Sequence, residues 1–274
     1  MKSGVMLLTV LTWLVCLPVR AADHYILGVQ DYVKNPILVV RDYQGLASYL
    51  AKALKKPVRI EAVKTYDDYM KKAAAKRFDF MYAPPSMIMK AHFTAGYEPV
   101  AKIPGLLSAS FMTMDPNIAF PEDMKGKRIG FYEKDAMITQ LALTELKSTG
   151  IDPAKYFKSI TYYSDSGGVL NAMQYKLIDI GVANSSLFNN WTNHGNNINL
   201  VLQGKGVPHL TFAVRGDLPA ATKQAVTQAL LKAHLEKEKD KDAQDFFKFT
   251  SFTNFEPAKV SDFDELVKFL NITK

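Results

Sequence analysis

Cysteine is nearly absent from this chain, and its scarcity excludes several kinds of chemistry. Cys16 is the only cysteine among the 274 residues, and it lies in an N-terminal segment that we expect to be removed. The mature chain would then contain no thiol, so disulfides, cysteine nucleophiles and cysteine-ligated metals are excluded. An exported protein without cysteine is compatible with a bacterial periplasm.

Signatures of catalysis are also absent. The sequence has no Gly-x-Ser-x-Gly, no glycine-rich phosphate loop and no His-Glu-x-x-His, the local patterns that mark common hydrolases, nucleotide-binding enzymes and metalloproteases. The 5 histidines are scattered without metal-ligand spacing. We therefore predict a protein that is not an enzyme and uses no cofactor or metal. Ferric-ion binding by a tyrosine-rich cleft stays open as an alternative.

A concentrated basic surface is lacking too. The formal net charge is +7, but the densest charged run, residues 234–242, alternates in sign. Alternation is typical of a solvated helix face, whereas nucleic-acid binding needs a basic stripe with interleaved aromatic residues. We expect no nucleic-acid partner.

The N-terminus has the order of a secretory signal. Lys2 is followed by an apolar run over residues 5–18 and by small-residue positions that end at Ala21. The run is shorter than the ~20 apolar residues that a membrane-spanning helix needs. We predict that residues 1–21 are a signal peptide, cleaved near Ala21, and that the protein is periplasmic.

An internal repeat organises the rest of the chain. Lys, Asp, Ala and Ser recur in register in two stretches, residues 76–86 and 176–186. Each stretch is expected to form a short buried strand, a turn and a helix start, and each follows a strand and a helix. Two such units predict two similar lobes with a cleft between them. Asp79 and Asp179 recur in both copies, and we interpret them as structural residues that bond loop amides.

Strands that alternate with helices at this spacing indicate an α/β architecture with largely parallel sheets. We place lobe one at residues 22–111 plus 212–274 and lobe two at residues 112–211. Residues 112–116 and 209–211 are expected to be the crossing strands that act as a hinge. Ligands of such sheets lie outside the carboxyl ends of the strands.

The order of several short motifs resembles a known family. The motifs are Gly150-Ile-Asp-Pro153, Ile178-Asp179-Ile-Gly181, Arg215-Gly-Asp217-Leu-Pro219 and the strand that ends at Phe131. Together they resemble the PhnD-like periplasmic solute-binding proteins of phosphate, phosphite and phosphonate ABC importers. The resemblance covers nearly the whole mature chain. It implies a two-lobed type II periplasmic binding protein fold, with a central ligand cleft and two hinge strands, that captures a small solute without covalent chemistry.

The candidate ligand-binding residues follow the predicted strands. Aromatic and hydroxyl side chains there can stack on a ligand or donate hydrogen bonds, glycine lets a ligand approach backbone amides, and asparagine both donates and accepts. These candidates are Tyr32, Tyr66, Tyr82 and Ser86 in lobe one, and Asp135, Ser166, Gly167, Asn184 and Ser185 in lobe two.

Asp135 stands where the resembled family has a Ser/Thr-rich turn. We expect Asp135 to cap the following helix, which would place negative charge at the positive helix end. Ser166 can cap its own helix in the same way. A polar neutral or zwitterionic solute is therefore predicted in place of a phosphonate or phosphate.

Two functions stay open at this point. The first is solute capture for an ABC permease, and the second is a periplasmic sensor subunit that binds a receptor kinase or a related membrane signalling protein. We expect a monomer in either case.

Overall fold

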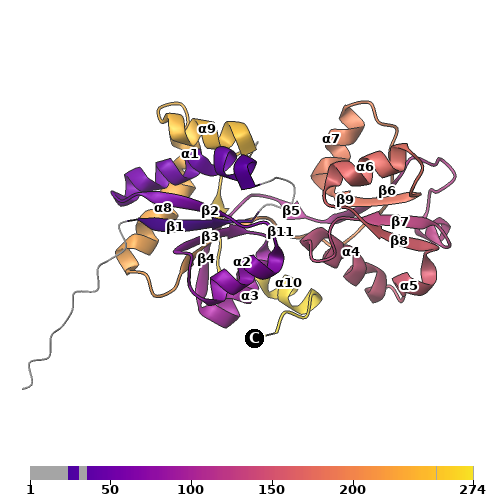
Figure 1. Cartoon of the computed structure of the whole chain (residues 1–274), viewed down its shortest axis with the longest axis horizontal. Helices are drawn as coiled ribbons and strands as arrows, with labels where there is room; N and C mark the ends of the chain where they lie inside the picture. Colours follow the sequence, from indigo (N-terminus) through magenta and orange to yellow (C-terminus); the bar gives the residue numbers. More distant parts are fainter. Residues whose placement is uncertain (1–23, 31–35, 251, 274) are drawn as a thin grey trace, which may run out of the picture.

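The computed structural model describes residues 24–30, 36–250 and 252–273. These residues form two α/β lobes side by side, with a thin connection between them (Figure 1). The two-lobed prediction is confirmed. The predicted signal peptide, with Cys16, and the candidate Tyr32 lie outside the described residues.

Lobe one is built on a six-stranded sheet of order β13-β4-β12-β3-β1-β2. Its strands are β1 (Tyr25–Val29), β2 (Val58–Ala62), β3 (Phe80–Ala83), β4 (Tyr97–Lys102), β12 (Thr211–Arg215) and β13 (Glu256–Pro257). Its helices are α1 (Pro36–Leu54), α2 (Tyr66–Ala74), α3 (Pro85–Ala95), α8 (Ala220–Glu236) and α9 (Lys241–Thr250).

Lobe two has a five-stranded sheet of order β10-β6-β9-β7-β8. Its strands are β6 (Ala109–Thr113), β7 (Arg128–Phe131), β8 (Ser159–Tyr162), β9 (Ile180–Asn184) and β10 (Asn199–Gln203), and its helices are η1 (Pro121–Met124), α4 (Met137–Ser148), α5 (Pro153–Tyr156), α6 (Ser166–Gln174) and α7 (Ser185–Asn193). The chain ends in η2 (Val260–Phe263) and α10 (Asp264–Phe269).

The lobes are joined by a two-stranded antiparallel sheet of β5 (Leu106–Leu107) and β11 (Val207–Pro208). The connection thus lies before residues 112–116 and 209–211, where the crossings were predicted. Residues 112 and 113 belong to β6, which already pairs with β9 in the second sheet. Residues 109–111, which the sequence assigned to lobe one, belong to that sheet. An apolar run shows that a strand is buried but does not show which sheet it joins.

The internal repeat appears as equivalent hydrogen bonds. Asp79 Oδ2 accepts the amide of Ile26 in β1 at 2.8 Å, and Asp179 Oδ2 accepts the amide of Arg128 in β7 at 2.8 Å. The Arg128 side chain also donates to Asp179, and this hydrogen bond lowers the pKa of the carboxyl. Asp79 thus fixes β3 against β1, and Asp179 fixes β9 against β7.

Close packing repeats as well. A Cβ added to Gly28 in β1 would lie 2.6 Å from the Phe78 ring, and one added to Gly130 in β7 would lie 2.5 Å from the Ile178 side chain. Phe78 and Ile178 each directly precede the repeated aspartate. Only glycine lets these residues pack this close to the first strand.

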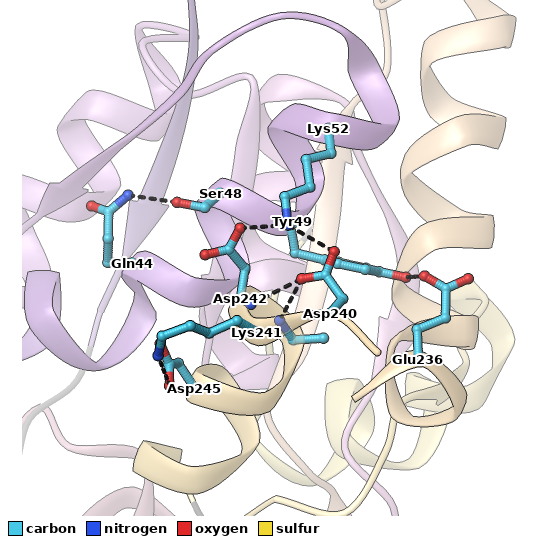
Figure 2. A network of polar contacts seen from close by, with 10 residues as sticks. Gln44, Ser48, Tyr49, Lys52, Glu236, Asp240, Lys241, Asp242 and Asp245 are labelled. Carbon is cyan, nitrogen blue, oxygen red and sulfur yellow. Dashed lines mark hydrogen bonds and ion pairs between the residues drawn. The ribbon is translucent and has the colours of Figure 1, made fainter. Parts of the chain in front are cut away.

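Helix α9 is tied to α1 by a polar network on the outer side of lobe one (Figure 2). Lys52 Nζ lies 2.7 Å from carboxylate oxygens of Asp240 and Asp242. The Tyr49 hydroxyl donates to Glu236 at 2.7 Å, which adds α8 to the network.

No helix in the described part of the chain is long and apolar enough to cross a membrane.

The repeated aspartates yield a first prediction. Asp79→Ala and Asp179→Ala should each lower the free energy of unfolding by about 1–3 kcal/mol, because each leaves a strand amide without its acceptor. Urea unfolding followed by circular dichroism measures the effect. The exposed Glu238 serves as the control, and Glu238→Ala should change stability by less than about 0.5 kcal/mol. Equal effects at all three positions would contradict the role of the aspartates.

Candidate functional site

A cavity of about 300 Å³ lies between the two lobes. Four of its lining residues stand at the carboxyl ends of equivalent strands: Gln30 after β1, Pro84 after β3, Tyr132 after β7 and Asn184 at the end of β9. This is the position at which α/β sheets bind their ligands. The other lining residues are Tyr43, Thr250 and Phe252 of lobe one, Ala136, Met137, Ile138, Ser186 and Leu187 of lobe two, and Leu107, His209 and Leu210 of the connection.

The cavity wall is mainly apolar. None of the lining residues in the described part of the chain carries a carboxylate, an ammonium or a guanidinium group. Its polar side chains are Gln30, Asn184, Ser186, His209 and Thr250, besides the tyrosines. Small-molecule sites of this kind combine an apolar wall with a few placed polar groups. No group of acidic, histidine or cysteine residues suited to a metal ion occurs among the described residues.

The Gln30 side chain is an unusual feature of the cavity. Its exposed fraction is 3%, and neither Nε2 nor Oε1 has a hydrogen-bond partner among the described residues. The backbone amide is bonded, since it donates to the carbonyl of Tyr82 at 3.1 Å. A buried polar group without a partner costs about 1–3 kcal/mol, so an amide left in this state is suited to a ligand that completes its bonds.

His209 supplies a neutral donor. Its Nδ1 accepts the amide of Leu210 at 2.8 Å, and this bond places the proton of the neutral ring on Nε2. Burial lowers the pKa of His209 to about 4. The ring also packs edge-on against Phe252, with centroids 6.2 Å apart.

Helix starts contribute backbone donors. Helix α4 begins at Met137 after the N-cap residue Ala136, and no side chain caps it. Helix α7 is capped, because Asn184 Oδ1 accepts the amide of Leu187 at 2.9 Å. The first turn of α4 therefore presents uncapped amides and the positive end of its dipole to the cavity wall.

Of the predicted lobe-two candidates, only Asn184 lines this cavity. Ser185 is its chain neighbour, and its amide bonds the carbonyl of Ser108 at 3.3 Å. Gly167 is exposed, and Ser166 is buried in the first turn of α6 beside the lining residue Tyr132 but does not itself line the cavity. The predicted cap by Ser166 is wrong: Asp165 is the N-cap residue, and its Oδ1 accepts the Gly168 amide at 2.8 Å.

Asp135 also differs from the prediction. It is exposed and precedes Ala136, the actual N-cap residue, and it does not line the cavity. The helix starts one residue later than a cap at Asp135 requires. Asp135 therefore leaves the α4 amides open, and the predicted cap by Asp135 is wrong.

The lobe-one candidates separate into two groups. Tyr82 is 1% exposed and packs in the core of the lobe, with its ring 5.5 Å from that of Tyr43. Tyr66 and Ser86 line a smaller cavity of about 220 Å³ together with Lys90, Gln140 and the C-terminal residues 270–273. The sequence-based candidates therefore did not include several lining residues: Gln30, Tyr43, Tyr132, Met137, Leu187, His209 and Phe252.

Comparisons with known proteins agree with this architecture. The profile of a family described as "ABC transporter, phosphonate, periplasmic substrate-binding protein" matches residues 33–263. No curated protein sequence matches the chain.

Solved structures are similar in fold at low sequence identity. PhnD1 of Prochlorococcus marinus, in complex with methylphosphonate, has 14% identity and a TM-score of 0.77 over 92% of this chain and 99% of that chain. A protein of Xanthomonas citri bound to ATP has 15% identity and a TM-score of 0.76 over 92% and 97%. A binding-protein component of an ABC phosphonate transporter from Pseudomonas aeruginosa has 14% identity and a TM-score of 0.73 over 89% and 84%.

Because Asp165 caps α6 and no side chain caps α4, the two aspartates Asp165 and Asp135 should differ in their effect on stability. Asp165→Ala should lower the free energy of unfolding by about 0.5–2 kcal/mol, because it removes a helix cap. Asp135→Ala should change it by less than about 0.5 kcal/mol. Denaturant unfolding of both variants gives the comparison, and a larger loss for Asp135→Ala would restore the original assignment.

Burial of His209 predicts a pH dependence. The pKa of a histidine is about 6.5 in an unfolded chain and is lowered to about 4 here. The unfolded state therefore binds the proton first, and this contribution to stability is present above pH ~6.5 and is lost as the pH falls toward ~4. The variant His209→Asn keeps an acceptor for the Leu210 amide but does not titrate.

The melting temperature of His209→Asn should fall less between pH 7 and pH 5 than that of the wild type. The exposed His194 provides the control, since His194→Asn should follow the wild type. An unchanged pH dependence in His209→Asn would contradict the burial of a neutral imidazole.

Proposed function

This chain belongs to the family of periplasmic substrate-binding proteins of phosphonate ABC transporters, and we propose that it captures a small solute in the cavity between its lobes. The observation that carries the proposal is the position of the cavity at the carboxyl ends of β1, β3, β7 and β9, with the unpaired Gln30 amide in its wall. Both lobes and the connection contribute to the wall, so a bound solute contacts all three.

Family membership also supports a cellular location and a protein partner for this chain. Proteins of this family work in the periplasm and deliver solutes to an ABC permease, which favours import over the sensor alternative. For this chain we propose removal of residues 1–21, with cleavage near Ala21, and action as a monomer that binds its solute without chemical change.

Blocking the cavity tests the proposal. Ala136 is 2% exposed and lines the cavity, so Ala136→Trp fills it, and Leu187→Trp fills it from the half-buried start of α7. The probes are methylphosphonate, inorganic phosphate, benzoate, benzamide and uracil. At least one of them should raise the melting temperature of the wild type.

A ligand at a hundred times its Kd adds about 2.7 kcal/mol to stability, which raises the melting temperature of a chain of this size by about 2–4 °C per kcal/mol. The shift should vanish in both blocked variants and persist in Ala221→Trp, where the substituted residue is exposed on α8. A shift that survives in both blocked variants would place the ligand elsewhere.

A further inference from the structure

The unpaired amide of Gln30 defines the class of ligand more narrowly than the fold does. We propose that the cavity selects an uncharged solute with an amide-type edge, in which an N–H donor and a carbonyl acceptor lie side by side, on a small apolar or aromatic body. This inference rests on the proposed function, because it concerns the ligand of the same cavity.

The first argument is the pairing of donor and acceptor. The Gln30 side chain presents both an NH₂ donor and a carbonyl acceptor, and both are buried without a partner among the described residues. A carboxylate or a fully deprotonated phosphonate accepts from Nε2 but leaves Oε1 beside another electron-rich oxygen. An ammonium ion donates to Oε1 but leaves Nε2 unpaired. An amide, cyclic or open, satisfies both atoms in two parallel hydrogen bonds and carries no charge.

The second argument is charge. The lining residues in the described part of the chain carry no charged side chain, and a buried ion without a partner is strongly disfavoured. His209 is kept neutral by burial and holds its proton on Nε2, so it can donate to a second carbonyl of the ligand without adding charge. The uncapped amides of α4 are neutral donors of the same kind.

The rest of the cavity wall is apolar. Met137 and Ile138 of α4 are 3% and 6% exposed, and Leu187 and Phe252 complete an apolar surface. Such a surface gains from contact with a hydrocarbon or aromatic body at roughly 25 cal/mol per Å² of apolar area buried. The cavity volume of about 300 Å³ restricts that body to a small molecule.

Three ligands that each carry a phenyl ring test whether the head group decides the affinity. Benzamide, benzoate and phenylphosphonate differ in the charge and hydrogen bonding of the head group, and calorimetric titration gives Kd for each. Benzamide should bind the wild type at least about tenfold more tightly than either anion. Gln30→Leu should weaken benzamide about tenfold or more, which corresponds to ~1.4 kcal/mol, and should weaken the anions less. Gln224→Leu, at an exposed glutamine of α8, should leave all three affinities unchanged.

The outcomes distinguish this inference from the proposed function. Tighter binding of benzoate or phenylphosphonate, failure of benzamide to bind, or benzamide affinity unaffected by Gln30→Leu would each overturn the amide class. If any probe binds the wild type and is excluded by Ala136→Trp, solute capture stands even though the class is wrong. Circular dichroism spectra and melting temperatures of Gln30→Leu and of the more conservative Gln30→Met verify that the loss does not arise from misfolding.

Discussion

In each lobe, an aspartate directly before one strand accepts a hydrogen bond from the adjacent parallel strand, and the site depends on this constraint. Asp79 holds β3 against β1, and Asp179 holds β9 against β7, at equal distances of 2.8 Å. Register in a sheet determines where each strand ends. The two bonds therefore bring four strand ends to the same space between the lobes, and Gln30 and Asn184 face this space for that reason.

The repeat could be predicted from the sequence because it is local. Lys76 and Lys176, the first residues of the two copies, both have a left-handed backbone, with φ of 53° and 55°. The lobe to which β6 belongs could not be predicted, because it depends on pairing with β9, which lies more than sixty residues later in the chain. Local patterns determine which segments are strands, whereas long-range pairing determines the lobe to which each strand belongs.

The site residues could be predicted only in part, for two physical reasons. Successive side chains of a strand point to opposite faces. Tyr82 points toward the core, whereas Gln30 and Asn184, at the ends of β1 and β9, line the cavity. A cap also depends on the exact first turn of the helix. Asp135 and Asp165 look alike in sequence, but α4 starts at Met137 while α6 starts at Ser166, so only Asp165 reaches an open amide.

Discrimination among ligands then depends on desolvation more than on attraction. The chain carries a formal net charge of +7, yet its charged side chains stand outside the lining that the structure describes. The open start of α4 offers only about half a unit of positive charge, which suits a carbonyl oxygen and is small beside the two negative charges of a phosphonate. Gln30 rather than Asp135 disfavours a fully deprotonated phosphonate, because Oε1 would face an oxygen anion without a proton between them. A ligand can bring the lobes together only by the difference between its contacts in the two arrangements. A solute that pairs with Gln30 in lobe one and packs on α4 in lobe two makes that difference, whereas one that satisfies a single lobe leaves the connection at β5 and β11 unbiased.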